Sequence, residues 1–264
     1  MYEFNYQRPG SLDDAVSALR SAEDGQFMAG GMTLLPTLKQ RLARPSDVID
    51  LAGVPGLSGI SEEGGNIVVG AMTRHTEVAS SPVVQAAIPA LAALADGIGD
   101  PQVRNRGTIG GSVANADPAA DYPAALVGLG ATVNTNQRSI GADDFFTGMF
   151  DTALEDGEII VSVSFPKPKR ASYAKFPNPA SRYAIVGVMV AETDGGVRVA
   201  VTGAGGSVFR VAEMENALSG NFSADAVSGI SVGQGDLNED IHASAEYRAH
   251  LVTVMAKRAV AAAG

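Results

Sequence analysis

Ala29-Gly30-Gly31-Met32-Thr33-Leu34-Leu35-Pro36 is the first of two glycine-rich stretches in this chain of 264 residues. Residues 26–29 predict a short strand, and residues 33–42 have leucines at helical spacing. The glycine pair therefore lies where a strand passes into a helix. A helix N-terminus carries free N–H groups that favour an anion, and glycine lets a phosphate approach the backbone closely. The pattern indicates a phosphate-binding turn, with a plain tight turn as the alternative.

The second stretch is Gly107-Thr108-Ile109-Gly110-Gly111-Ser112. Its glycines offer backbone N–H groups, Thr108 and Ser112 add hydroxyl donors for phosphate, and Ile109 anchors the loop from beneath. The alternative is a glycine-rich loop that packs closely against another backbone. Asp121 follows at the start of the next predicted helix, where its carboxylate either accepts from sugar hydroxyls or caps the helix. Together the two stretches predict a site for the two phosphates of one dinucleotide.

Neither stretch carries the signature of the common nucleotide-binding loops. The pattern Gly-x-Gly-x-x-Gly is absent from both, and the chain has no Gly-Lys-Ser/Thr. A nicotinamide-type Rossmann domain and a P-loop NTPase are therefore disfavoured.

The composition excludes several classes of function. The net charge is −10 without a long run of Lys or Arg, so nucleic acids and anionic membranes are poor partners. The chain has no Cys and hence no disulfide, no thiolate nucleophile and no ligands for an iron–sulfur cluster. His75, His242 and His250 lie far apart and lack acidic neighbours at ligand spacing, so we expect no metal site. We also find no spacing that predicts catalytic residues.

The sequence also predicts location and domain organisation. Residues 1–6 lack the pattern of a signal peptide, and no apolar run is long enough to span a bilayer. We therefore expect a cytoplasmic protein without a transmembrane segment. The charged, proline-containing link at residues 166–170 predicts a boundary between a domain of residues 1–167, in two parts of about 1–55 and 56–167, and a domain of residues 168–264. Within the second domain, residues 184–191 and 197–202 predict a hairpin and residues 247–263 a helix.

Several segments are informative as a set, in the order Phe4–Ala15, Ala29–Pro36, Gly70–Thr73, Val103–Ser112, Ser181–Val188 and Asp240–Arg248. In this order they resemble the FAD-binding medium subunits of the molybdenum hydroxylases, the family of aerobic carbon monoxide dehydrogenase and xanthine dehydrogenase. The resemblance covers essentially the whole chain. It implies an α+β fold, with a two-part FAD-binding domain of the vanillyl-alcohol-oxidase (PCMH) type followed by a small C-terminal α+β domain.

The resemblance also implies the residues that bind the cofactor. The FAD pyrophosphate would be held by the two glycine-rich stretches, namely Ala29, Gly30, Gly31, Met32, Thr33, Thr108, Ile109, Gly110, Gly111 and Ser112. Asp121 would contact the ribityl or neighbouring hydroxyls, Tyr183 would cover one face of the isoalloxazine ring, and Ile160 would contact the adenine end. The chain departs from many relatives at Arg182, where an acidic residue is common, and in the proline-containing stretch at residues 176–180.

The function implied by the resemblance is electron transfer within a complex. A large partner subunit would hold the molybdenum cofactor and a small one the [2Fe-2S] clusters, in a dimer of heterotrimers. FAD in this chain would take electrons from the clusters and pass them to an external acceptor. Two alternatives stay open at this point: a stand-alone FAD-dependent oxidoreductase, and a scaffold subunit that no longer binds flavin.

Overall fold

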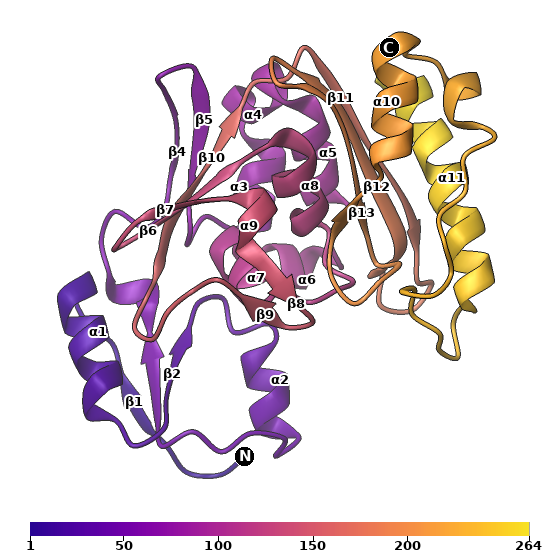
Figure 1. The fold of residues 1–264 in the computed structure, drawn as a ribbon. Coiled ribbons are helices and arrows are strands. Elements are labelled where there is room, and N and C mark those ends of the chain that lie inside the picture. Colours follow the sequence, from indigo (N-terminus) through magenta and orange to yellow (C-terminus); the bar gives the residue numbers. More distant parts are fainter. Residues whose placement is uncertain (264) are drawn as a thin grey trace.

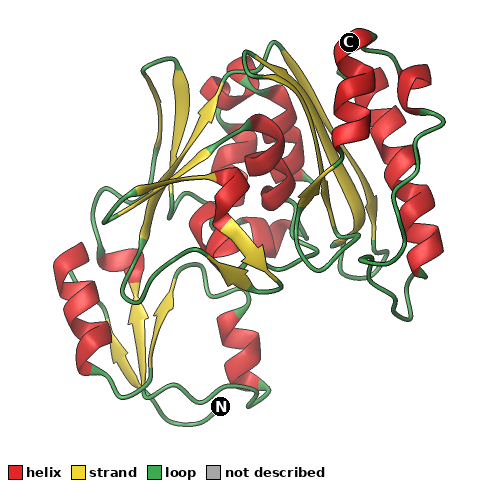
Figure 2. Cartoon of the chain, viewed as in Figure 1, coloured by secondary structure: helices red, strands yellow, loops and turns green. Residues whose placement is uncertain are grey.

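The computed structural model describes residues 1–263, which form four stacked layers and a smaller N-terminal unit (Figure 1). The layers are a sheet, a set of helices, a second sheet and a pair of outer helices, and their alternation is visible in Figure 2. This mixture of segregated sheets and helices is the predicted α+β class.

The N-terminal unit is a small parallel sheet covered by one helix. Its strands are β1 (Asn5–Gln7), β2 (Gly25–Met28) and β3 (Asp47–Asp50), in the order β1-β3-β2, and α2 (Leu34–Lys39) and a 3-10 turn at Leu51–Gly53 complete it. Helix α1 (Leu12–Ser21) begins where Ser11 Oγ accepts a hydrogen bond from the N–H of Asp14. Ala15 of α1 and Ile49 of β3 are fully buried in the core of this unit.

The central sheet is antiparallel, and helices cover one of its faces. Its strands, in spatial order, are β4 (Ile60–Glu63), β5 (Asn66–Gly70), β10 (Ile160–Pro166), β6 (Thr132–Thr135) and β7 (Ser139–Gly141). The helices are α3 (His75–Ser80), α4 (Pro82–Ala87), α5 (Pro89–Asp96), α6 (Pro101–Arg104), α7 (Ile109–Asn115), α8 (Tyr122–Leu129) and α9 (Ala142–Phe145). A hairpin of β8 (Phe146–Gly148) and β9 (Asp151–Thr152) follows α9. Every residue of α8 is buried, which places this helix in the middle of the molecule.

The C-terminal sheet packs between two sets of helices. Its strands are β11 (Arg170–Pro177), β12 (Ala184–Thr193), β13 (Gly196–Thr202) and β14 (Phe209–Arg210), and its outer helices are α10 (Ala212–Gly220) and α11 (Ala245–Ala262), with a 3-10 turn at Ala224–Val227. Along β12 the side chains alternate between two cores. Met189 and Ala191 join the core of the central helices, whereas Val188 and Val190 join the core formed with α11.

The C-terminal sheet also holds the segment that leads into α8. Thr202 Oγ1 donates to the carbonyl oxygens of Pro118 at 3.0 Å and Ala120 at 2.6 Å. The N–H of Gly203 donates to Pro118, and the N–H of Ala184 donates to Ala119. Residues 118–120 are therefore fixed by strands that follow them by more than sixty positions in the sequence.

Most of the strands and helices expected from sequence are confirmed. The predicted hairpin at residues 184–202, the C-terminal helix and the strand near residue 26 all form within a few residues of their expected bounds. The prediction of a loop at the second glycine-rich stretch was wrong. Residues 109–112 of this stretch are the first residues of helix α7. The boundary between residues 167 and 168 stays a prediction.

We expect Thr202→Val to lower the free energy of unfolding by about 1–3 kcal/mol, because the buried carbonyl of Ala120 then loses its donor. Urea denaturation of the full chain measures this. Thr132→Val is the matched control, since the Thr132 hydroxyl makes no hydrogen bond within residues 1–263, and it should change the stability by less than about 0.5 kcal/mol. Equal stability of the two variants would contradict the role of Thr202.

Candidate functional site

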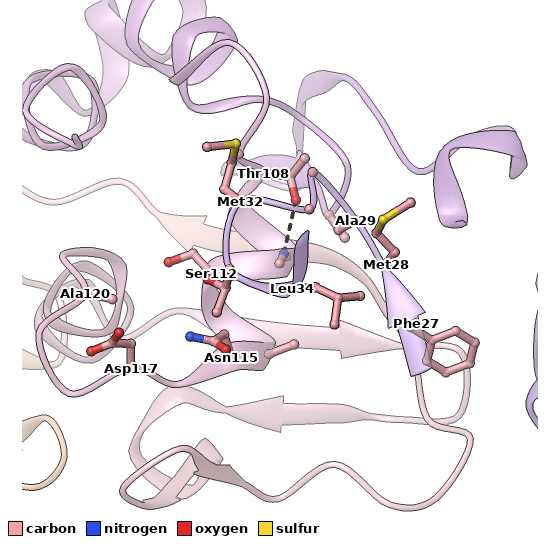
Figure 3. A pocket seen from close by; sticks show the side chains of 18 of the residues that line it. Phe27, Met28, Ala29, Met32, Leu34, Thr108, Ser112, Asn115, Asp117 and Ala120 are labelled. Carbon is pink, nitrogen blue, oxygen red and sulfur yellow. Dashed lines mark hydrogen bonds between the residues drawn. The ribbon is translucent and has the colours of Figure 1, made fainter. Parts of the chain in front are cut away.

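A cavity of about 860 Å³ lies between the N-terminal unit, the central helices and the C-terminal sheet. Its size falls in the range of small-molecule and cofactor sites. All of the site residues predicted from sequence line it except Ile109, which is fully buried behind it. Figure 3 shows Phe27 at one side of this cavity and Asp117 at the other, with Ser112 and Asn115 between them.

The first glycine-rich stretch presents a row of free donors to this cavity. Within residues 1–263, the N–H groups of residues 30–34 have no hydrogen-bond acceptor, and all five residues line the cavity. Gly31 has a φ of +73°, which lets the chain turn between β2 and α2. Consecutive free N–H groups at a turn into a helix are a binding site for an anion.

The two glycine-rich stretches are in direct backbone contact. A Cβ on Gly30 would overlap the carbonyl oxygen of Arg106, and a Cβ on Gly110 would lie 2.5 Å from the Cβ of Ala71. Only glycine fits at either position. The alternative interpretation of the second stretch, a segment that packs closely against another backbone, is therefore what the structure shows.

The N–H groups of residues 109–112 are not available to a ligand, and the sequence-based expectation was wrong for these four, whereas the N–H of Thr108 has no acceptor within residues 1–263. The N–H of Ile109 donates to the carbonyl of Thr73, and that of Gly110 donates to the carbonyl of Ala71. The N–H of Gly111 donates to Thr108 Oγ1 at 3.1 Å, the bond drawn in Figure 3, and that of Ser112 donates to the Thr108 carbonyl. Thr108 is thus the N-cap of α7: its hydroxyl oxygen accepts from Gly111, while its O–H proton has no acceptor within residues 1–263.

Side chains supply the donors on this side of the cavity instead. Ser112 and Asn115 lie on one face of α7, three positions apart, and neither side chain has a hydrogen-bond partner within residues 1–263. Thr33 lies on the first glycine-rich stretch, across the cavity, and its hydroxyl likewise has no hydrogen-bond partner within residues 1–263. Sequence reasoning missed Asn115, although the spacing from Ser112 would have identified it once residues 109–115 were recognised as a helix.

The end of the cavity beside α8 is built around a buried carboxylate. Asp121 is only 4% exposed and accepts from the Tyr173 hydroxyl at 2.5 Å and from Lys175 Nζ at 3.0 Å. Its side chain makes no capping bond to α8, so the capping interpretation was wrong. Burial raises the pKa of Asp121, and the Lys175 ammonium and the Tyr173 hydroxyl oppose this rise.

Aromatic and acidic side chains complete this α8 end of the cavity. Tyr183 lines it and is 44% exposed, and Arg182 lies beside it with a φ of +64°. Asp117 also lines this end, and burial raises the pKa of its carboxyl group. Phe150, at the tip of the β8–β9 hairpin, is exposed and has a φ of +54°.

The opposite end of the cavity lies beside β10. Ile160 is buried there, and the neighbouring Ile159 packs in the same core as Phe27. Glu158 lines this end. Its carboxylate accepts hydrogen bonds from Nε and Nη2 of Arg138, each at 3.0 Å. Hydrogen bonds from Arg138 hold the pKa of Glu158 at about 2, against a burial effect in the opposite direction. Glu158 is therefore an ionised structural group.

His75 is buried at the wall of the cavity, and its imidazole ring is uncharged near neutral pH. Burial lowers its pKa from 6.5 to about 4, and the charge of Arg104 acts in the same direction. Its Nδ1 has no hydrogen-bond partner, and its ring lies 5.4 Å from that of Tyr122, whose hydroxyl is also buried and unpaired.

The residues described contain neither a metal-binding cluster nor a membrane-spanning helix. No group of three or more His, Asp or Glu side chains among residues 1–263 is arranged to bind a metal ion. In the same part of the chain, no helix combines the length and apolar character needed to cross a bilayer.

Comparison with known proteins identifies the family. Residues 2–168 match the family described as the FAD binding domain in molybdopterin dehydrogenase. The chain belongs to this family. The nicotine 6-hydroxylase medium subunit of Paenarthrobacter nicotinovorans is 38% identical over 273 residues, covering 98% of this chain and 96% of the relative. The carbon monoxide dehydrogenase medium chain of Hydrogenophaga pseudoflava is 35% identical over 277 residues, with the same coverage of both chains.

Solved structures agree over the same length. A carbon monoxide dehydrogenase chain from Hydrogenophaga pseudoflava superposes with a TM-score of 0.90 at 36% identity, covering 99% of this chain and 97% of that one. A chain of quinoline 2-oxidoreductase from Pseudomonas putida 86 gives 0.89 at 30% identity, with the same coverage. The chain is thus an FAD-binding medium subunit of the molybdenum hydroxylases, an oxidoreductase of the carbon monoxide dehydrogenase type with FAD as its cofactor.

We expect the stability of the folded chain to depend on His75 between pH 6.5 and pH 4. The unfolded chain binds a proton at His75 from pH 6.5 downward, whereas the folded chain does so only near pH 4. The free energy of unfolding therefore falls as the pH falls, by about 3 kcal/mol over this interval. Urea denaturation between pH 7 and pH 4.5 should show that His75→Gln loses this component.

The control for this experiment is His250→Gln, which changes an exposed histidine on α11. It should keep the pH dependence of the original chain, because other titrating groups are unchanged. A His75→Gln profile parallel to that of the original chain would contradict the assignment.

Proposed function

We propose that this chain is the electron-transfer subunit of its enzyme. In this role it takes electrons from the [2Fe-2S] clusters of a small partner subunit and passes them to an external acceptor, while a large partner holds the molybdenum cofactor. FAD, when bound, supplies the redox chemistry. The chain itself has no Cys and cannot provide thiolate ligands for a cluster.

One observation carries the proposal, namely the row of free N–H groups at residues 30–34 on the wall of an 860 Å³ cavity. A pyrophosphate needs several donors at once, and consecutive N–H groups that the chain itself does not use meet this need. Ser112 and Asn115 add two unpaired polar side chains from α7. The residues present therefore fit a dinucleotide.

Each predicted site residue has a role in this proposal. Ala29, Gly30, Gly31, Met32 and Thr33 hold the pyrophosphate from one side, and Ser112 holds it from the other. Thr108 adds its hydroxyl proton on that side, while Ile109, Gly110 and Gly111 act indirectly, because their N–H groups form the start of α7 and bring Ser112 into place. Asp121 accepts from the ribityl hydroxyls, Tyr183 covers one face of the isoalloxazine ring, and Ile160 contacts the adenine end.

The assembly and the location are part of the same proposal. Relatives of this chain are named as medium subunits or medium chains, which supports one large and one small partner. We also infer, from the membership of this chain in the molybdenum hydroxylase family, a dimer of such heterotrimers located in the cytoplasm. The external acceptor meets the chain at the α8 end, where Tyr183 and Phe150 are exposed.

A visible absorption spectrum of the purified full-length chain, before and after addition of FAD, tests the proposal. We expect flavin bands at close to one FAD per chain. Flavin in a co-purified complex, together with loss of flavin reduction when the small subunit is removed, would support electron entry from the clusters. A chain that binds no FAD, alone or in its complex, would overturn the proposal in favour of a scaffold. Direct reduction of the isolated flavoprotein by a small organic substrate would favour a stand-alone oxidoreductase.

We expect Ser112→Ala to weaken FAD binding by about tenfold or more, because a hydrogen bond to a charged phosphate contributes about 1.5–3 kcal/mol. Titration of the apo-chain with FAD, followed by fluorescence, gives the dissociation constant. Ser80→Ala, on the exposed surface of α3, is the matched control and should bind FAD as the original chain does. Unchanged affinity in Ser112→Ala would remove this hydroxyl from the phosphate site.

A further inference from the structure

Lys175 on β11 uses all of its hydrogen-bonding capacity at one point behind the cavity. Its Nζ donates to the carbonyl of Gly97 at 2.8 Å, to Asp121 Oδ2 at 3.0 Å and to the carbonyl of Arg182 at 3.0 Å. An ammonium group has three N–H donors and no acceptor, so every donor has a partner. The side chain is only 12% exposed.

These three partners belong to separate parts of the chain. Gly97 follows α5, Asp121 precedes α8, and Arg182 belongs to the loop between β11 and β12. Lys175 is therefore the point at which the central helices and the β11–β12 loop are joined at the α8 end of the cavity. Because it does not line the cavity itself, it acts on a ligand only through its partners.

The β11–β12 loop is held both by hydrogen bonds within it and by contacts from outside. Within it, the N–H of Arg182 donates to the carbonyl of Asn178 at 2.9 Å, and the N–H of Asn178 donates to the carbonyl of Tyr183 at 2.8 Å. Arg182 has a φ of +64°, a left-handed conformation that costs about 1–3 kcal/mol in a residue other than glycine and persists only when neighbouring contacts maintain it. Two contacts tie this residue to the rest of the molecule: Lys175 binds the Arg182 carbonyl, and Arg182 Nη1 donates to the carbonyl of Gly99 at 3.1 Å. Tyr183 comes directly after Arg182, so these two contacts fix the position of its backbone relative to the central helices, while Asn178 holds it within the loop.

Asp121 completes the arrangement on the other side of Lys175. Its other carboxylate oxygen accepts from Tyr173, whose ring crosses Gly187 so closely that a Cβ there would overlap the hydroxyl oxygen. The carboxylate is thus fixed, and it holds the ammonium between α8 and the loop. In a buried ion pair of this kind, the hydrogen bonds fix the positions of both side chains. Removal of one partner leaves the charge of the other uncompensated.

We propose that Lys175 is a positioning residue that sets the orientation of Tyr183 at the cavity. This inference rests on the proposed function, since it takes Tyr183 as the residue that covers the flavin ring. Lys175→Met should release the Arg182 carbonyl and let the loop relax from its left-handed conformation. The absorption maxima and the midpoint potential of bound FAD should then shift, because an aromatic side chain on the ring changes both.

A double-mutant cycle on the full-length chain tests this route of action. We expect Lys175→Met to shift the flavin spectrum and midpoint potential in the original chain but to cause no further shift in a Tyr183→Ala background. If Lys175 only stabilised the fold, its replacement would lower the melting temperature, and its effects on the flavin spectrum and potential would add to those of Tyr183→Ala. Additive shifts, or a Lys175→Met spectrum and potential equal to those of the original chain, would overturn the proposal.

Two further variants keep the result interpretable. Lys167→Met removes a half-exposed lysine that binds Glu62 at 2.6 Å, and it should leave the spectrum and potential unchanged. Lys175→Gln keeps an amide donor and serves if Lys175→Met does not fold, with a smaller shift in the same direction. Absence of FAD binding by the original chain would instead reject the proposed function, and with it this inference, whereas normal binding with an unaffected Lys175→Met rejects this inference alone.

Discussion

The backbone contact between the two glycine-rich stretches is the constraint on which the cavity depends. Gly30 lies against the carbonyl of Arg106 and the Cα of Gly107, with no room for a side chain. This contact brings the β2–α2 turn beside the start of α7 and places free N–H groups opposite Ser112 and Asn115. A single methyl group would separate the two walls, since protein interiors have no spare volume for it.

The C-terminal sheet determines the shape of the other end of the cavity. Thr202 and Gly203 fix residues 118–120, and Lys175 fixes the loop that ends in Tyr183. Three of the non-glycine residues with positive φ, Ala116, Phe150 and Arg182, lie around this end. Strained backbone of this kind is typical of functional sites, where surrounding contacts maintain it. The C-terminal part therefore contributes to the site and is more than a support for it.

Sequence reasoning predicted the site well where the signal was local. The change from strand to helix around Gly30 and Gly31 follows from hydrophobic spacing, and both stretches do meet at one cavity. It failed where the signal depended on partners. The spacing of residues 107–112 gave no sign that Ala71 and Thr73 accept their N–H groups, and the sequence around Asp121 gave no sign of Tyr173 or Lys175. Hydrogen-bond partners distant in the sequence cannot be deduced from local patterns.

The sequence by itself determined the family, the class of cofactor and the absence of cluster ligands, because ordered motifs and the lack of Cys need no coordinates to be recognised. It also determined most strands and helices, since hydrophobic periodicity is a local property. Only the tertiary structure decided which groups remain free to bind. Every N–H group near a glycine is a candidate in the sequence, but packing leaves those of residues 30–34 free and consumes those of residues 109–112. The physical reason is that a donor satisfied by a distant backbone carbonyl is lost to a ligand, and only the fold brings that carbonyl close.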